Sequence, residues 1–304
     1  MPKIALIIGY GSIGKKHAQI LKKIKGINEV VVLTSQKNIP FKKITKLSEV
    51  KKIDPFYIVI ASPTNKHFQE LKFIEKNFCN KKILIEKPIF EKKQNLVIKK
   101  NHVFVGYNLR FHKVLEYIKK KINKKKIIFS NSYCGYFLPK WRKGIKYSNS
   151  YSAKKERGGG VIFDLSHELD YLRWLFGELN IINAVNKKIS NLKINSDDFL
   201  TFNASSKKTK IIQLNINYIS KKKIRTINIE TEKFGLYGDL IKNKVEIIYD
   251  NKKEIKKWSE DKGYLQTYVE QHKAIIFNKN KNKLCTYRDG LETLNLITDI
   301  KKIK

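Results

Sequence analysis

Short apolar runs alternate with amphipathic segments over the first third of the chain. After the first run, Ile13, Ile20 and Ile24 recur at helical spacing on one face. Apolar runs without polar alternation are typical of parallel strands that helices bury on both faces. The pattern predicts strands at residues 3–8, 29–33, 57–61, 83–85 and 103–105, with helices between them.

The pattern changes after Phe111. A predicted helix over 111–123 leads to a strand over 127–137, and a polar, aromatic loop runs from 138 to 157. Gly158-Gly159-Gly160 then opens a predicted helix that continues to about Phe176. Strand-like runs joined by lysine-rich turns follow, as in an antiparallel sheet. These runs lie at 181–185, 199–204, 211–219, 224–231 and 245–249, and predicted helices at 264–277 and 290–303 end the chain.

A glycine-rich turn, Gly9-Tyr10-Gly11-Ser12-Ile13-Gly14, connects the first strand to the first helix. In this context Gly9 makes a tight turn, Gly11 lets a pyrophosphate approach the backbone, and Gly14 lets the helix pack on the strand. The helix N-terminus supplies amide donors to phosphates. We therefore expect all six residues of the turn to bind a nicotinamide dinucleotide.

The end of the second strand bears on the choice between NAD and NADP. It reads Leu33-Thr34-Ser35-Gln36-Lys37, without the acid that often accepts from the ribose 2′-hydroxyl of NAD. A hydroxyl at Ser35 and a cation at Lys37 suit a 2′-phosphate, so the sequence favours NADP over NAD. The alternative is that Lys37 is one more surface lysine.

These patterns predict an α/β N-terminal Rossmann domain over residues 1–112 and an α+β C-terminal domain over 113–304 with an open, mostly antiparallel sheet. We expect the second domain to bind substrate and to mediate a homodimer or homotetramer, because one face of its sheet is left free. The last helix is expected to pack back on the Rossmann domain.

The chain of 304 residues carries a net charge of +37, which ordinarily indicates a nucleic-acid partner. Only six of its 64 basic residues are arginine, however, and the lysines are spread along the chain with abundant Ile and Asn, the residues of AT-rich codons. Proteins that recognise nucleic acid tend to use arginine for bidentate contacts. We therefore expect no specific nucleic-acid partner.

The cysteines and the N-terminus indicate the compartment. Cys79, Cys134 and Cys285 are far apart, which argues against a disulfide framework and against a cysteine-rich zinc site. No apolar run approaches the roughly 20 residues of a membrane helix, and the N-terminus is typical of a first strand, not of a signal peptide. We expect a cytoplasmic protein with no membrane span and no metal site.

Four further segments lie in a fixed order after the glycine turn. They are Ala61-Ser62-Pro63-Thr64-Asn65-Lys66-His67, Glu86-Lys87-Pro88, the run 105–111, and the run 158–170, which contains Asp164 and His167. Together with the turn, this set resembles the Gfo/Idh/MocA family of oxidoreductases over nearly the whole chain. Trp141-Arg142, Tyr147 and the run 150–153 resemble family members associated with bacterial surface-sugar biosynthesis.

The resemblance implies hydride transfer between nicotinamide C4 and a secondary alcohol or ketone carbon of a sugar or nucleotide sugar. It implies that Lys87 touches substrate and nicotinamide, where an ammonium stabilises a developing alkoxide. It also implies that His167 moves the hydroxyl proton. Asp164 would orient His167, although Asp170 lies equally far from it along the chain and leaves the partner open.

The resemblance also assigns binding residues. The expected cofactor contacts beyond the turn are Ser35, Lys37, Ser62, Thr64, Asn65, His67, Glu86, Lys87 and Asn108; the expected substrate contacts are Arg110, Trp141, Arg142 and Tyr151. Simpler roles stay open for several of these residues. His67 and His167 would be packed core histidines, Arg110 would brace the domain junction, and the 138–157 loop would form a subunit interface.

Two other functions of the same fold stay open from the sequence. One is a non-catalytic sensor that binds cofactor and sugar, against which the presence of Lys87 and His167 argues. The other is an NAD-dependent, redox-neutral glycosidase, in which the hydride leaves and returns within one turnover.

Overall fold

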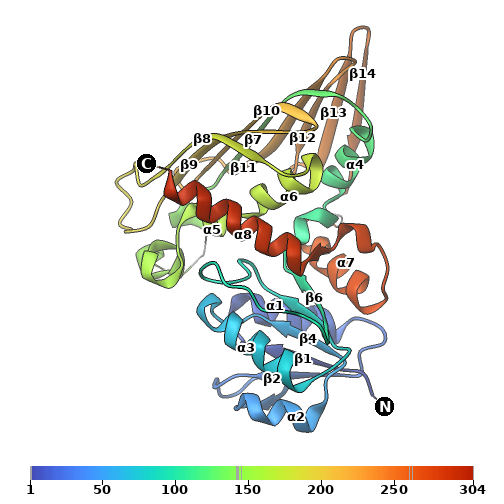
Figure 1. Cartoon of the computed structure of the whole chain (residues 1–304), viewed down its shortest axis with the longest axis vertical. Coiled ribbons are helices and arrows are strands. Elements are labelled where there is room, and N and C mark those ends of the chain that lie inside the picture. The colour runs from blue at the N-terminus through green and yellow to red at the C-terminus, as the bar shows by residue number, and fades with distance from the viewer. Residues whose placement is uncertain (1, 142–143, 145, 260, 262, 304) are drawn as a thin grey trace. The chain divides into compact units, whose positions relative to one another are not determined.

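The computed structural model describes residues 2–141, 144, 146–259, 261 and 263–303. The chain divides into two compact units (Figure 1): Met1–Asn108 with Tyr268–Leu294, and Leu109–Thr267 with Asn295–Lys304. The domain boundary after residue 112 stays a prediction. Residues 268–294 cluster with the first unit. The apolar pattern in the first third of the chain did not predict that this distant segment belongs there.

The first unit is built on a parallel sheet with one antiparallel edge strand. Its strand order, β15-β6-β5-β4-β1-β2-β3, contains the order expected of a Rossmann fold, which confirms that prediction. The central strands are almost completely buried because helices cover both faces. The strands are β1 (Ile4–Ile8), β2 (Glu29–Leu33), β3 (Lys42–Ile44), β4 (Tyr57–Ile60), β5 (Lys82–Ile85), β6 (His102–Val105) and β15 (Cys285–Thr286).

The helices of this region follow the predicted apolar periodicity. They are α1 (Ser12–Lys22), α2 (Val50–Ile53) and α3 (Thr64–Asn77), with most of α7 (Tyr264–Ile276) and the first half of α8 (Tyr287–Lys302); α8 from Asn295 onward clusters with the second unit. The two short strands β3 and β15 were not predicted, because two or three residues carry too little pattern.

The second unit contains an eight-stranded sheet of order β14-β13-β12-β11-β7-β10-β9-β8. Every neighbouring pair is antiparallel except β7 with β10, which is parallel, so the mostly antiparallel sheet is confirmed. Strands β12 and β14 were not predicted, and β14 (Lys-Lys-Glu-Ile-Lys-Lys) has almost no apolar signal. The strands are β7 (Ile127–Gly135), β8 (Asn180–Lys187), β9 (Phe199–Ser206), β10 (Thr209–Asn217), β11 (Ile224–Thr231), β12 (Gly235–Asp239), β13 (Lys244–Tyr249) and β14 (Lys252–Lys257).

One face of this sheet forms the core of the second unit. Leu200, Phe202 and Ala204 alternate along β9 toward the buried face. They cluster with Leu169 and Leu172 of the covering helix α6. Three helices lie in the first part of this unit's sequence: α4 (Lys113–Lys121), α5 (Val161–Asp164) and α6 (His167–Phe176).

The single helix expected from Gly160 to Phe176 is wrong, because α5 ends at Asp164 and α6 begins at His167. Between them the Ser166 N–H bonds to the Phe163 carbonyl oxygen, three residues back, so the turn is tighter than an α-helix. Asp164 and His167 therefore belong to different helices and do not share one helix face.

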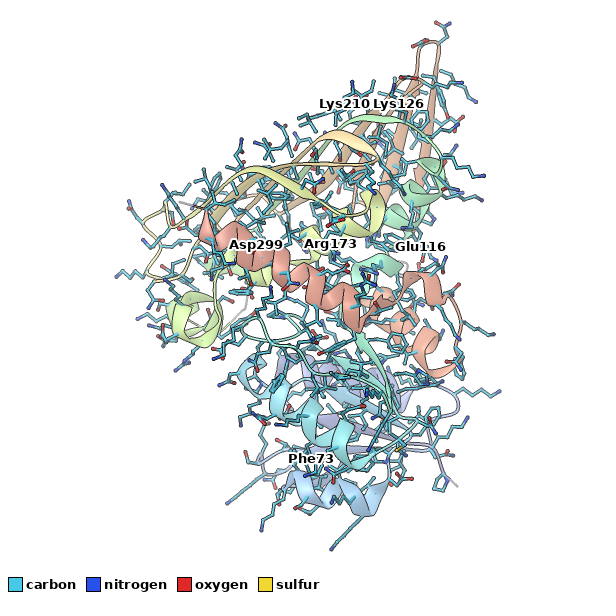
Figure 2. The ribbon with its side chains drawn as sticks, in the orientation of Figure 1. Phe73, Glu116, Lys126, Arg173, Lys210 and Asp299 are labelled. Carbon is cyan, nitrogen blue, oxygen red and sulfur yellow. The ribbon has the colours of Figure 1, made fainter. Side chains whose placement is uncertain are left out.

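The remaining segments are loops with single 3₁₀ turns, and the surface is rich in lysine. Side chains such as Lys126 and Lys210 extend outward from the second unit (Figure 2). Among the described residues, no helix combines the length and apolar character that a membrane crossing demands. The 3₁₀ turns are Leu47–Glu49, Asn108–Phe111, Leu138–Lys140, Tyr147–Asn149, Tyr151–Ala153, Lys155–Arg157 and Lys281–Lys283.

Candidate functional site

The glycine turn lies at the carboxyl edge of the first unit's sheet. Gly9 has φ of 94°, and a Cβ there would lie 2.6 Å from the Ser62 backbone. A Cβ at Gly14 would lie 2.1 Å from the Gly9 carbonyl oxygen, so α1 packs directly on the turn. A Cβ at Gly11 would meet nothing within 4 Å. The turn therefore offers open space at Gly11, beside the N-terminus of α1, which fits the pyrophosphate of a dinucleotide.

The loop after β2 folds against this turn through Gln36, which the sequence did not single out. The Gln36 side-chain amide donates to the Tyr10 carbonyl oxygen (3.0 Å). Ser35 and Lys37, the two residues predicted to contact a 2′-phosphate, are exposed on either side of it. The predicted contacts of both residues stay predictions.

The ends of β4, β5 and β6 bring further candidate residues to the same edge. The ladder continues past the strand ends, since the N–H groups of Ala61, Glu86 and Gly106 bond to carbonyl oxygens of Ile8, Ile60 and Ile85. Ser62, Glu86 and Lys87 therefore follow neighbouring strands. Of the other predicted residues here, Thr64 is half-buried, Asn65 is exposed, and Asn108 is buried.

His67 braces two of these loops. Its Nδ1 lies 3.1 Å from the Ile89 carbonyl oxygen, and its Nε2 lies 3.0 Å from the Ser62 carbonyl oxygen. Burial lowers the pKa of His67, although the carbonyl contacts at Ser62 and Ile89 act in the opposite direction. The ring thus ties the loop after β4 to the loop after β5, and its contact with a cofactor stays a prediction.

Glu86 is a buried carboxylate at the end of β5, beside half-buried Lys87. Its Oε2 accepts the Lys87 backbone N–H (3.1 Å), and its Oε1 lies 2.9 Å from His17 Nε2. Burial alone would raise the pKa of Glu86, but the hydrogen bond from His17 and the charge of Lys87 outweigh it, so the pKa lies below the usual value. Gly106 makes room for the carboxylate, since a Cβ there would lie 2.9 Å from Oε1.

In the second unit, Asp164 accepts hydrogen bonds from two tyrosines. The Tyr218 hydroxyl donates to Oδ2 (2.6 Å), and the Tyr151 hydroxyl donates to Oδ1. Burial, and next the charge of Asp164, raise the pKa of Tyr218 well above its usual value. Tyr218 stands just beyond β10 and carries no motif, so sequence reasoning missed it. His167 is buried at the first residue of α6, and its partnership with Asp164 stays a prediction.

Arg110 and Asp170 form a buried, bidentate ion pair. Arg110 Nε and Nη2 donate to Asp170 Oδ2 (2.9 Å) and Oδ1 (2.7 Å), and both side chains are at most 4% exposed. The pair lies within the second unit, so bracing of the domain junction and contact with substrate both stay predictions for Arg110. Asp170 is paired with a guanidinium and Asp164 accepts from hydroxyl groups; which of them orients His167 stays open.

The aromatic loop between β7 and α5 packs partly on its own unit. Trp141 stacks on Tyr136 with ring centroids 5.6 Å apart, and its Nε1 donates to the Tyr136 carbonyl oxygen (3.0 Å). Its ring also meets Tyr218 edge-on at 5.1 Å. Arg142, predicted to bind substrate, lies outside the described residues. Substrate contacts of Trp141 and Tyr151 stay predictions.

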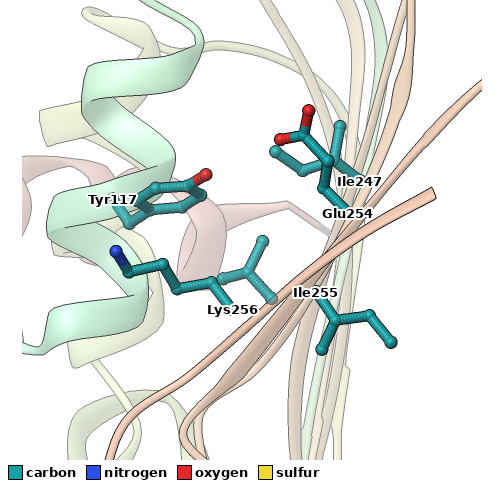
Figure 3. A pocket seen from close by; sticks show the side chains of 6 residues that line it. Tyr117, Ile247, Glu254, Ile255 and Lys256 are labelled. Carbon is teal, nitrogen blue, oxygen red and sulfur yellow. The ribbon is translucent and has the colours of Figure 1, made fainter. Parts of the chain in front are cut away.

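A surface pocket elsewhere in the second unit contains none of the predicted site residues. Tyr117 of α4 faces Lys256 and Glu254 of β14 across it, with Val245, Ile247 and Ile255 completing its lining (Figure 3). The carboxylate of Glu254 is already paired with Lys252 (2.7 Å) and Lys121 (3.7 Å). The pocket therefore offers no acid–base group comparable to those at the sheet edge.

Comparison with known families agrees with this geometry. The oxidoreductase family with an NAD-binding Rossmann fold matches residues 4–105, and its C-terminal alpha/beta domain matches residues 119–302. The chain belongs to the Gfo/Idh/MocA family of oxidoreductases. No curated protein matches the chain.

Solved structures share the fold of this Gfo/Idh/MocA protein at low sequence identity. Levoglucosan dehydrogenase in complex with NADH and L-sorbose superposes with a TM-score of 0.81 at 14% identity, covering 99% of this chain and 96% of that chain. UDP-N-acetylglucosamine 3-dehydrogenase GnnA from Acidithiobacillus ferrooxidans gives a TM-score of 0.77 at 14% identity, with 99% and 97% covered. GenD2 from gentamicin A biosynthesis in complex with NAD gives 0.77 at 14% identity, with 99% and 93% covered.

The three glycines of the turn give a matched pair of tests. Gly11→Ala should fold normally, because its φ of −71° suits alanine and its Cβ meets open space, yet NADH should bind at least about tenfold more weakly. Gly14→Ala should instead lose about 2–4 kcal/mol of stability, because its Cβ would overlap the Gly9 carbonyl. Fluorescence titration with NADH and urea unfolding measure the two effects. Full NADH affinity in Gly11→Ala would show that phosphate does not occupy this space.

Glu70 makes stability depend on pH near the same edge. It accepts a hydrogen bond from the Ser62 hydroxyl (2.5 Å), and burial raises its pKa to about 7. A carboxyl group whose pKa is higher in the folded state binds protons preferentially there, so its ionisation lowers stability as pH rises from about 4.5 to 7.

Glu70→Gln should therefore gain about 2–3 kcal/mol relative to wild type between pH 4.5 and 7, with no further change above that range. Urea unfolding across this range measures the difference, with exposed Glu91→Gln as the matched control. Parallel pH profiles for wild type and Glu70→Gln would contradict the assignment.

Proposed function

We propose that the protein is an NAD(P)-dependent oxidoreductase that transfers a hydride between nicotinamide C4 and a secondary alcohol or ketone carbon of a sugar or nucleotide sugar. The observation that carries the proposal is the placement of Lys87 beside buried Glu86, at the sheet edge that also bears the open glycine turn. The related levoglucosan and UDP-N-acetylglucosamine dehydrogenases support a sugar as substrate.

Each proposed role follows from the chemistry of its group. The residues of the glycine turn would hold the pyrophosphate, with the nicotinamide near Lys87. When bound, the nicotinamide supplies the hydride acceptor or donor. In the oxidative direction the substrate C–H bond loses its hydride, and the O–H proton goes to His167. The Lys87 ammonium stabilises the oxyanion that develops as the carbonyl forms.

The second unit would supply the proton-transfer group and much of the substrate pocket. Tyr151 and Tyr218 hold the Asp164 carboxylate at fixed geometry through their hydroxyl groups. In the proposed mechanism Asp164 stabilises the imidazolium that His167 becomes on accepting the proton.

Lys87→Met tests the mechanism. Removing the ammonium should lower kcat at least about hundredfold, because the oxyanion loses its charged partner, while NADH affinity stays within about threefold. The measurement is absorbance at 340 nm with NAD⁺ or NADP⁺ and a panel that includes levoglucosan and UDP-N-acetylglucosamine. Exposed Lys92→Met is the matched control and should keep wild-type activity. Wild-type turnover in Lys87→Met would refute the catalytic role.

For the cofactor, we propose a preference for NADP over NAD, based on Ser35, Lys37 and the missing acid after β2. Levoglucosan dehydrogenase was solved with NADH and GenD2 with NAD, so this preference would set the protein apart from these two relatives.

Lys37→Glu should weaken NADPH binding at least about tenfold, because the 2′-phosphate would face a carboxylate instead of an ammonium. NADH affinity should change less than about threefold. Paired fluorescence titrations measure both affinities. Tighter binding of NADH than of NADPH by the wild type would overturn the proposed preference.

A further inference from the structure

Four buried side chains of the first unit form a continuous hydrogen-bonded chain that ends at Glu86. The Tyr57 hydroxyl lies 2.9 Å from His272 Nδ1, and His272 Nε2 lies 2.8 Å from His17 Nδ1. His17 Nε2 lies 2.9 Å from Glu86 Oε1. The members come from β4, α7, α1 and the end of β5, and none of them was assigned a role from the sequence except Glu86.

The chemistry of the groups sets the direction of the donors. An ionised Glu86 can only accept, so His17 Nε2 carries a proton and donates. A neutral His17 then accepts at Nδ1 from His272 Nε2, and His272 accepts at Nδ1 from the Tyr57 hydroxyl. Every polar atom of the chain is satisfied in this arrangement, and both imidazoles are the Nε2–H tautomer.

The reverse direction is disfavoured by burial and charge. It requires a doubly protonated His17 and leaves the Tyr57 hydroxyl proton without an acceptor, because His272 is its one hydrogen-bond partner in the described part of the chain. Burial lowers the pKa of His272 well below the usual value, which agrees with a neutral ring.

The hydrogen-bonded chain has no contact with solvent at its Tyr57 end, remote from Glu86. Tyr57, His272 and His17 are all 0% exposed. A proton therefore has no direct route from Tyr57 to water, so the chain does not act as a proton exit. Its effect is positional and electrostatic: it presents one N–H to Glu86 and holds that N–H in place.

The charges around Glu86 are consistent with one stable anion. Lys16 and Lys87 are cations that interact with it, and burial keeps Tyr57, His67 and His272 in their uncharged forms. Two nearby ammonium groups already balance the carboxylate, so a further buried positive charge on an imidazole is unfavourable.

We propose that His17 and His272 are positioning residues, which act through the one-directional chain Tyr57–His272–His17–Glu86 to keep the Glu86 carboxylate ionised and fixed beneath Lys87. Glu86 Oε2 in turn holds the Lys87 backbone N–H. The proposal rests on the proposed function in one respect, the assignment of Lys87 to catalysis. The hydrogen-bonded chain from Tyr57 to Glu86 does not depend on that assignment. It also gives α7 a part in the candidate site, although α7 lies far from β5 in sequence.

The protonation pattern can be measured without substrate. Nitrogen-15 NMR of the imidazoles in the full-length protein should show both histidines as Nε2–H tautomers at pH 8, and the buried His272 ring should not titrate between pH 5.5 and 8. His17→Gln and His272→Gln assign these signals by their loss. An Nδ1–H tautomer at either position, or a titrating His272 ring, would overturn the proposed direction of the hydrogen-bonded chain.

A pair of variants at position 272 tests the effect on Glu86. Glutamine at 272 can still donate to His17 and accept from Tyr57, whereas phenylalanine can do neither. Carbon-13 NMR of labelled glutamate carboxylates should show Glu86 ionised down to at least pH 4.5 in wild type and His272→Gln. In His272→Phe and His17→Phe its titration should move at least one pH unit upward.

Activity should follow the same pattern. The ratio of kcat/KM at pH 8 to that at pH 5 should rise about twofold or more in His272→Phe and stay unchanged within error in His272→Gln. Tyr171→Phe, at another fully buried tyrosine in the second unit, controls for general loss of stability and should leave the ratio unchanged. An unchanged Glu86 titration in His17→Phe would refute the positioning role.

The outcomes separate this proposal from the proposed function. If Lys87→Met keeps its activity while the NMR pattern is as described, the catalytic assignment fails and the chain stands. If Lys87→Met is inactive but either ring is an Nδ1–H tautomer, the proposal for the hydrogen-bonded chain fails alone.

Discussion

The burial of the Glu86 carboxylate at the end of β5 is the constraint on which the candidate site depends. A carboxylate removed from water is costly unless hydrogen bonds and opposite charges compensate it. Here His17 and Lys87 provide that compensation, and the absence of a side chain at Gly106 leaves room for the carboxylate. The fold must therefore hold α1, β5 and β6 at fixed positions along this edge. The backbone of Lys87 is fixed as well, because its N–H bonds to Glu86.

The carboxyl edge of the parallel sheet gathers the remaining groups of the first unit. Successive strands end at one edge, so the glycine turn, Ser62 and Lys87 become neighbours although they lie far apart in sequence. His67 ties two of the loops together through backbone carbonyls. The result is a rigid edge with open space at Gly11, which suits a ligand that binds through backbone amides.

The second unit also contains buried carboxylates, those of Asp164 and Asp170. Asp164 is satisfied by two tyrosine hydroxyls, and Asp170 by the guanidinium of Arg110. The two carboxylates are close together in sequence but have different partners: neutral hydroxyl groups bond to Asp164, and a cationic guanidinium bonds to Asp170. The break between α5 and α6 makes this possible, because it uncouples the direction of Asp164 from the helix that carries Asp170.

The sequence alone determined the features that depend on local pattern. Apolar runs and helical periodicity predicted the Rossmann sheet, and the spacing of Gly9, Gly11 and Gly14 predicted a turn whose glycines are required by backbone angle and close packing. The order of the family motifs identified the edge residues Glu86 and Lys87. Tertiary structure alone decided the partners: His17 meets His272, 255 residues away, and Tyr218 meets Asp164. Such contacts join side chains of ordinary appearance from distant segments, and no local spacing encodes them, because they arise only when the packed helices and strands fix which faces meet.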